Sequence, residues 1–197
     1  MHPAKSVILF TMIYASLRPV RAWASPWTLP GYVVLAALTG AVLVNLLLQL
    51  WGLPLAAPFA WIVLLLLALG AGVKLLYWRD IADDSGASTA GTATGLGALG
   101  EVRLLEAPHS ESNYLLREMG FKVARKHAAK LRRIVLAAGF AAPALPVALG
   151  GLLSGALGIA AALCATVLVG LGIAVERWLF FAEAKHAVTL YYGESRA

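Results

Sequence analysis

Few polar side chains interrupt the two long apolar stretches of this sequence, and these few are the first candidates for chemistry. Asn45 and Gln49 lie four residues apart, so they share one face of a helix. Such side chains form hydrogen bonds between helices in a bilayer, each contributing about 0.6–2 kcal/mol. The alternative is a hydrogen bond from either amide to a quinone carbonyl, which makes Asn45 and Gln49 the candidate quinol-binding residues.

The residue types that hold metals and haems are sparsely placed. The histidines are His2, His109, His127 and His186, and none lies in an apolar stretch, where a b-type haem would need its axial ligands. Cys164 is the sole cysteine, so an internal disulfide is impossible and one thiol is too few for a zinc or iron–sulfur site. We therefore expect no haem, no metal and no catalytic residue, so the chain is not an enzyme by itself.

A glycine-rich segment at residues 95–100 matches the G-x-G-x-x-G pattern of dinucleotide-binding turns. That function needs a buried strand before the glycines and a helix after them, with its N-terminus directed at the pyrophosphate. Residues 87–94 are small and polar and show no strand pattern. We interpret the match as a chance occurrence in a flexible linker.

The apolar stretches themselves define the fold class. Residues 22–73 form a run of 52 without a charge, and residues 134–175 form another of 42. A helix needs about 20 residues to cross the hydrocarbon core, so each run accommodates a hairpin of two helices. The sequence therefore predicts an all-α integral membrane protein, a single membrane-anchor domain with full transmembrane helices at about 29–51, 59–78, 134–151 and 156–181.

Two flanking segments complete the predicted architecture. Residues 7–17 are apolar but too short to span, so we expect an incomplete first helix that leads into the loop at Arg18 without crossing the bilayer. Residues 79–133 form a long loop that is flexible at first. From Ser112 its apolar residues recur at spacings of three and four, which indicates an amphipathic basic helix. This cytoplasmic helix either lies along the membrane surface or docks a partner.

Two expectations concern the interior of the spans. We expect no carboxylate and no lysine there, and this absence argues against a proton pump or an ion-coupled transporter. Pro143 and Pro146 lie in the third span and should kink it. Aromatic residues near the ends of the spans, including Trp51, Trp61 and Trp178, are expected to form belts at headgroup depth.

The net charge of +6 would suggest a nucleic-acid partner in a soluble protein, but here the basic residues flank apolar spans, so none is expected. The turns at 52–58 and 150–155 carry no basic residue, whereas the long loop is rich in them. The positive-inside rule therefore places the long loop and the C-terminus in the cytoplasm. The arginines expected to fix this topology, or to face anionic lipid, are Arg18, Arg21, Arg117, Arg125 and Arg133.

Three stretches carry a family resemblance. They are residues 14–23 with 26–30 (YASLRPVRAW and PWTLP), residues 92–109 (with TATGLG and LEAPH), and residues 113–128 (with NYLLREMGF). Together they resemble the membrane-anchor subunit of the dimethyl sulfoxide reductase family. The similarity runs from about Met12 to the C-terminus and therefore covers most of the chain.

This resemblance implies a multi-pass subunit of the bacterial cytoplasmic (inner) membrane. Such anchors tether a molybdopterin catalytic subunit and a ferredoxin-type iron–sulfur subunit, and they oxidise menaquinol in anaerobic electron transport. Family members have several spans between an opening like residues 1–8 and the first motif, and we interpret their absence here as an internal deletion. The family's quinol residues lie in that part, so none is carried onto this chain. The alternatives are a structural anchor or truncated remnant without quinol activity, and a small-solute transporter.

Overall fold

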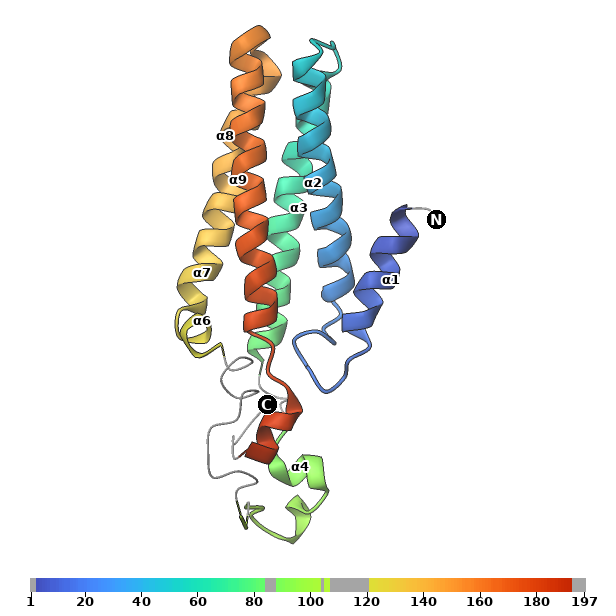
Figure 1. Ribbon diagram of the computed structural model, residues 1–197, viewed down its shortest axis with the longest axis vertical. Helices are drawn as coiled ribbons and strands as arrows, with labels where there is room; N and C mark the ends of the chain where they lie inside the picture. The colour runs from blue at the N-terminus through green and yellow to red at the C-terminus, as the bar shows by residue number, and fades with distance from the viewer. Residues whose placement is uncertain (1–2, 84–87, 104, 107–120, 193–197) are drawn as a thin grey trace.

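The computed structural model describes residues 3–83, 88–103, 105–106 and 121–192. Within these ranges four long apolar helices stand side by side, and the described segments contain no strand (Figure 1). By length and composition each helix can cross a membrane, which confirms the predicted fold class. The first two are α2 (Thr28–Leu50) and α3 (Ala56–Ala82), and the last is α9 (Gly155–Ala182).

The third long helix is continuous but not uniform. It runs through α7 (Ala128–Ile134), the π-helical segment η3 (Val135–Ala141) and α8 (Ala142–Leu152). Pro143 has no N–H, and its ring displaces the carbonyl four residues earlier. The backbone widens just before this proline, so that the Ala142 N–H donates to the Ala137 oxygen, five residues back. The local response to Pro143 is therefore a π-helical turn within an unbroken helix.

Small residues let this third helix approach α9 closely. Gly139 of η3 lies directly against Gly172 of α9, and a Cβ added to Gly172 would overlap the backbone of Gly139. Fully buried aliphatic side chains fill the rest of the interior, among them Leu38, Val63, Val147 and Val169. Large apolar side chains such as those at 65, 145, 157 and 171 remain exposed on the outside, where lipid would cover them.

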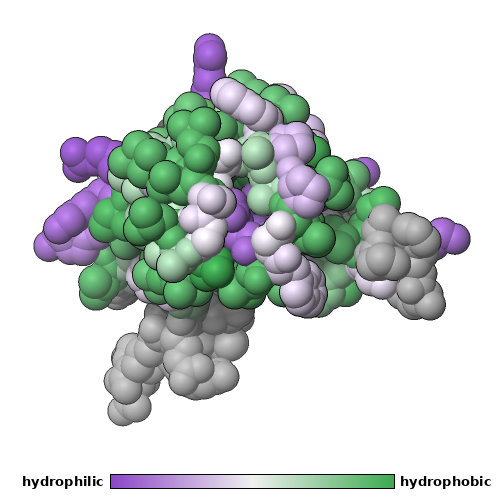
Figure 2. All heavy atoms as spheres, turned by 90° about the horizontal axis from the view of Figure 1, so that it is seen from above, coloured by the Kyte–Doolittle hydropathy of each residue, from purple (hydrophilic) through white to green (hydrophobic). Residues whose placement is uncertain are grey.

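The ends of the bundle differ in character. Both short turns, between α2 and α3 and between α8 and α9, lie at one end, and the described residues that follow α3 and α9 lie at the other (Figure 1). Figure 2 looks onto the end with the short turns and shows hydrophobic side chains over most of it. Trp51 and Trp61 are 69% and 73% exposed, as expected for an interfacial belt.

The N-terminal helix α1 (Pro3–Ala15) packs beside α2 and is too short to span. At 1.5 Å per residue its thirteen residues reach about 20 Å, against roughly 30 Å of hydrocarbon. Its chain then turns through residues 16–27 before α2 begins. The short N-terminal apolar segment of the predicted fold is thus present as a helix.

The basic segment before the third span is divided at His127 into α6 (Lys122–Lys126) and α7, and α7 continues directly into the span. The expected start of this helix at Ser112, and Arg117, lie outside the described residues. In the linker, the glycine-rich segment follows the short helix α4 (Ala90–Thr94) and includes the 3-10 turn η2 (Gly97–Leu99). A helix rather than a strand precedes these glycines, so the requirement for dinucleotide binding is not met. A second 3-10 segment, η4 (Ala187–Tyr192), follows α9.

Candidate functional site

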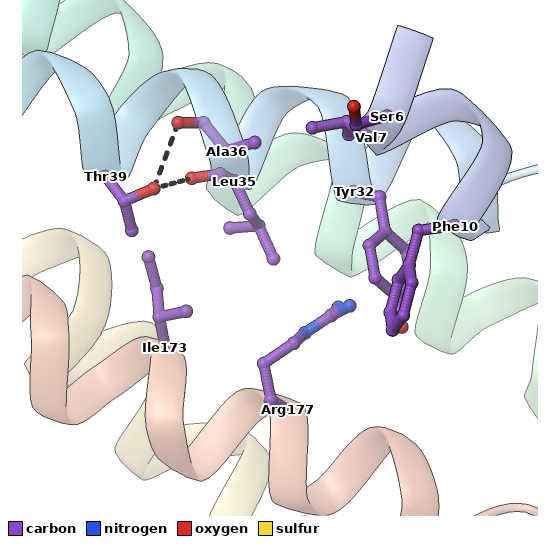
Figure 3. Close-up of a pocket in the computed structure, with 9 residues that line it drawn as sticks. All are labelled: Ser6, Val7, Phe10, Tyr32, Leu35, Ala36, Thr39, Ile173 and Arg177. Carbon is purple, nitrogen blue, oxygen red and sulfur yellow. Dashed lines mark hydrogen bonds between the residues drawn. The ribbon is translucent and has the colours of Figure 1, made fainter. Parts of the chain in front are cut away.

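An open groove of about 440 Å³ lies where α1 meets α2 and α9 (Figure 3). Most of its wall is hydrocarbon, and the Thr39 hydroxyl is already used, because it donates to the backbone carbonyls of Leu35 and Ala36. The groove therefore suits an apolar ligand with few polar atoms. The residues that line it are Ser6, Val7, Phe10, Tyr32, Leu35, Ala36, Thr39, Ile173 and Arg177.

Among the described residues that line this groove, Arg177 is the one that carries a charge. Its Nε donates to Glu176 Oε2 at 2.5 Å and its Nη2 donates to Glu176 Oε1 at 2.8 Å. The guanidinium also lies 4.2 Å from the centre of the Tyr32 ring, and Figure 3 shows it directed across the groove toward that ring. Arg177 Nη1 is buried and has no hydrogen-bond partner. A residue that lines an otherwise apolar groove thus carries one charged donor without a hydrogen-bond partner.

Glu176 connects the groove to a second cation inside the bundle. Lys74 Nζ lies 2.6 Å from Glu176 Oε1, and the two side chains are 3% and 1% exposed. Lys74 also lies 3.8 Å from the centre of the Tyr77 ring. One carboxylate is therefore shared by two cations, and the cluster of Lys74, Glu176 and Arg177, the charge cluster, joins α3 to α9 beside the groove.

The expectation that the spans hold no lysine or carboxylate is wrong. Lys74 lies about 12 Å before the end of α3, and Glu176 lies about 9 Å before the end of α9. Opposite charges in contact neutralise each other, and this makes their burial tolerable in a membrane protein. The argument against an ion-coupled transporter depends on their absence and therefore fails.

A further ion pair lies toward the end that carries the long loop. Arg132 Nη2 lies 2.7 Å from Glu183 Oε1, and the Glu183 side chain is only 6% exposed. Burial raises the pKa of the Glu183 carboxyl above its ordinary value, although Arg132 acts in the opposite direction. Arg125 donates from Nε to the Ala182 oxygen and from Nη2 to the Ala184 oxygen, so it caps the C-terminal end of α9.

Aromatic side chains surround the charge cluster and turn inward. Tyr14, Trp23, Tyr32, Phe180 and Phe181 pack edge-on or stacked, with ring centres 5.3–6.1 Å apart. The Trp23 indole N–H donates to the Phe180 oxygen at 3.2 Å. At this end several of the aromatics expected in a lipid-facing belt are therefore part of the protein core, although Trp178 stays 46% exposed.

The candidate quinol residues Asn45 and Gln49 lie elsewhere on α2. Both are buried, and Gln49 Nε2 donates to the Gly150 oxygen of α8, which is the interhelical hydrogen bond that the sequence predicts for such side chains. Asn45 Oδ1 is buried without a partner. Neither residue lines the groove. Quinol binding by Asn45 and Gln49 stays a prediction.

Sequence reasoning missed Lys74, Glu176 and Arg177, although a signal was present. These residues bound the charge-free runs, and a charge beside such a run is easily taken as the end of a span. Helices α3 and α9 both end toward the long loop (Figure 1), so Lys74 and Glu176 lie at similar depth. Opposite charges at one depth on two spans predict a pair. Within the described ranges, no three His, Cys, Asp or Glu side chains gather as a metal site would require.

The geometry defines a multi-pass membrane bundle with a buried charge cluster beside an apolar groove. No protein-family model matches the chain, and no solved structure matches it. Among curated proteins, the chain is 28% identical over 181 residues to a sulfite dehydrogenase subunit of Allochromatium vinosum. The alignment covers 92% of this chain and 54% of that protein, so the chain spans about half the length of the relative. The likeness is to a subunit of a redox enzyme and does not single out the dimethyl sulfoxide reductase family.

Proposed function

We propose that this chain is a membrane subunit of a multi-subunit redox enzyme and that its groove binds menaquinol. It would anchor a molybdopterin catalytic subunit and an iron–sulfur subunit at the bacterial cytoplasmic membrane. The unpartnered Arg177 donor in an otherwise apolar groove is the observation that carries the proposal. The likeness to the sulfite dehydrogenase subunit and the resemblance to dimethyl sulfoxide reductase anchors support the class of complex.

The groove fits the chemistry of a quinol. A quinol has a flat apolar ring, two hydroxyl oxygens and a long hydrocarbon tail, and it needs few polar contacts. The volume of about 440 Å³ lies in the usual range for small-molecule sites, roughly 300–1,000 Å³. Phe10 and Ile173 offer apolar contact to the ring, while Arg177 and the Tyr32 hydroxyl are the groups able to bond its oxygens.

Each residue near the groove has a distinct role in this proposal. Menaquinol supplies two electrons and two protons when it is bound. Arg177 would hold a quinol oxygen through its free Nη1–H, while its other two hydrogen bonds to Glu176 fix the orientation of the guanidinium. Lys74 balances the charge of Glu176, so that this carboxylate tolerates burial. Phe10 and Ile173 exclude water.

The placement of basic residues supports the orientation included in this proposal. Neither short turn contains Lys or Arg, whereas Arg132, Arg133, Lys126 and Lys130 gather near the start of the third long helix. The positive-inside rule then assigns this end, and the C-terminus, to the cytoplasm. Partner subunits held in the cytoplasm would meet the basic end, and exported partners would meet the short turns.

Binding of a fluorescent quinol-analogue inhibitor to the full chain in lipid nanodiscs tests the groove. We expect Arg177→Gln to weaken binding about tenfold or more, because a hydrogen bond from a charged donor contributes about 1.5–3 kcal/mol. Arg133→Gln, at an exposed arginine near the same end, is the matched control and should bind like the wild type. No binding to the wild type would favour a purely structural anchor or a truncated remnant, and equal binding to Arg177→Gln would reject the proposed site.

The anchoring role needs its own measurement. The chain, tagged and purified from its native membranes under mild conditions, should bring molybdenum and iron with it in fixed ratio, measured by elemental mass spectrometry. Recovery of the chain without these metals would contradict an anchor of the proposed complex. Solute flux in proteoliposomes that contain only this chain would instead favour a transporter.

A further inference from the structure

A second cavity, of about 300 Å³, lies beside the loop between α1 and α2. It is formed by that loop, by the last turn of α3 and by the segment just before α4. The quinol proposal makes no use of it. The residues that line it are Arg18, Pro19, Arg21, Ala24, Ser25, Pro26, Asp80 and Ser88.

The charges in this cavity do not balance. Two arginines and one aspartate line it, and no ion pair within the described residues joins Asp80 to Arg18 or Arg21. Asp80 Oδ2 instead accepts a hydrogen bond from Ser25 Oγ at 2.6 Å. Arg21 Nη1 is buried without any partner. A cationic N–H that is shielded from water and has no acceptor is unfavourable, so this cavity favours an anion.

Hydrogen bonds of Ser25 stabilise the loop that forms one wall of this cavity. Ser25 is 6% exposed, and its Oγ both donates to Asp80 and accepts the Trp27 N–H at 3.2 Å. These bonds fix the loop from α1 to α2 against the end of α3. They therefore hold the loop that carries Arg21, whose side chain is half-buried.

The depth of the cavity indicates the source of the anion. Arg21 is the last charge before the apolar run, and α2 begins shortly afterwards at Thr28. Trp23 and Trp27 lie in the same loop, and tryptophan favours the level of lipid headgroups. Basic pockets between transmembrane helices at the cytoplasmic face bind headgroups of anionic lipids.

We propose that this cavity binds the phosphodiester of an anionic phospholipid, held by Arg21 and Arg18. Arginine presents a planar set of donors that matches phosphate oxygens. Asp80 disfavours a second negative charge in the same space, so the singly charged phosphodiester is preferred over a phosphate dianion. This site shares no residue with the quinol groove, so a negative test of one proposal does not affect the other.

Retention of lipid by the full chain tests this site. The protein is extracted into detergent, exchanged against mixed phosphatidylglycerol and phosphatidylcholine, and examined by native mass spectrometry. We expect the wild type to retain phosphatidylglycerol, and expect Arg18→Gln/Arg21→Gln to lose about tenfold or more of that preference. Arg103→Gln, in the exposed pair with Glu101, should retain it fully, and Arg21→Lys should retain part, which separates a lost site from a misfolded protein.

Two further results decide the source of the phosphate. Millimolar inorganic phosphate should not displace the lipid from the wild type, and displacement would overturn the lipid assignment in favour of a soluble anion. Asp80→Asn should strengthen retention and allow inorganic phosphate to compete, because the repelling charge is gone. Unchanged retention in Arg18→Gln/Arg21→Gln, or no effect of Asp80→Asn on competition, would overturn the proposal.

Discussion

Glu176 is the residue on which the interior of this bundle depends. Its two carboxylate oxygens are shared between Lys74 of α3 and Arg177 of its own helix. An ion pair buried at 3% and 1% exposure loses most of its hydration, and removal of one partner leaves an uncompensated charge. Arg177 can therefore present its free donor to the groove only while Glu176 remains charged and in place.

Removal of Lys74 and Glu176 together should be less damaging than the sum of the two single removals. We expect Glu176→Met, which leaves Lys74 buried without a carboxylate, to lower the free energy of unfolding by about 3–5 kcal/mol. Lys74→Met should lower it less, because Arg177 still pairs with Glu176, and the double variant should lose clearly less than the sum. Unfolding in mixtures of dodecyl maltoside and sodium dodecyl sulfate measures this. Glu101→Gln, in the exposed pair with Arg103, is the control and should have no measurable effect. Additive losses would show that the two charges are not coupled.

Glu183 should give the protein a measurable pH dependence. Because burial raises its pKa, the folded state holds a proton above pH 4.5, where the unfolded carboxyl has begun to lose it. The contribution of this carboxyl to stability is full below its ordinary pKa and is lost as pH rises through the raised value. The unfolding free energy of the wild type, relative to Glu183→Gln, should therefore decrease with pH in that window. A flat difference would show that Arg132 fully offsets burial.

At the scale of elements, the contact between the π-helical segment and α9 sets how the bundle closes. Gly172 faces Gly139 without space for a Cβ, whereas nothing lies within 4 Å of a Cβ at Gly170 two residues earlier. The hydrophobic effect contributes little to helix association in lipid. Van der Waals packing between closely spaced glycines stabilises the contact instead. The same contact positions the last turns of α9, where Glu176 and Arg177 lie.

These two glycines form a matched pair for a test of that contact. We expect Gly172→Ala to destabilise the protein by about 1–3 kcal/mol, because backbone atoms must move apart. Gly170→Ala should be neutral or slightly stabilising, since alanine favours helix by about 1 kcal/mol over glycine. The same detergent unfolding measurement compares them. Equal effects at both positions would mean that α9 and the third helix do not pack as closely as described.

The sequence predicts the helices better than their ends. A charge-free run of 52 residues predicts a helical hairpin in a membrane. Hydrocarbon cannot form hydrogen bonds with backbone N–H and C=O groups, so these groups must bond to each other within a helix. The predicted end of the second span at 78 lies four residues before the observed end at Ala82, and the expectation that the spans hold no lysine or carboxylate is wrong. An oppositely charged residue on another helix can neutralise a charge inside a span. The residues next to that charge in the sequence do not reveal such a partner.

The candidate site is largely beyond reach from the sequence. The prediction that Asn45 and Gln49 share one face is confirmed, since a spacing of four fixes that face. Tyr32 and Arg177 meet only because α2 and α9 are neighbours, and Phe10 joins them because α1 folds back along α2. Such contacts between distant segments arise from tertiary packing, which residue spacing does not encode.

For the whole molecule, the arrangement predicts opposite sides for the short turns and the long loop. Cys164 is the sole cysteine and lies exposed on α9, so Cys164→Ala provides a background for single cysteines. Pro54→Cys and Leu153→Cys should react with an impermeant thiol reagent from one side of the membrane, and Ala90→Cys only from the other. Reaction of Pro54→Cys and Ala90→Cys from the same side would contradict the four-helix topology.

In our proposal the groove between α1, α2 and α9 binds menaquinol, and this can be mapped directly. A photoreactive menaquinol analogue is bound to the full chain in nanodiscs, irradiated, and located by peptide mass spectrometry. Crosslinks should fall on the segments that contain Phe10, Tyr32 and Ile173, and Arg177→Gln should reduce them. Crosslinks that cluster instead near Asn45 and Gln49, or persist unchanged in Arg177→Gln, would contradict quinol binding in this groove.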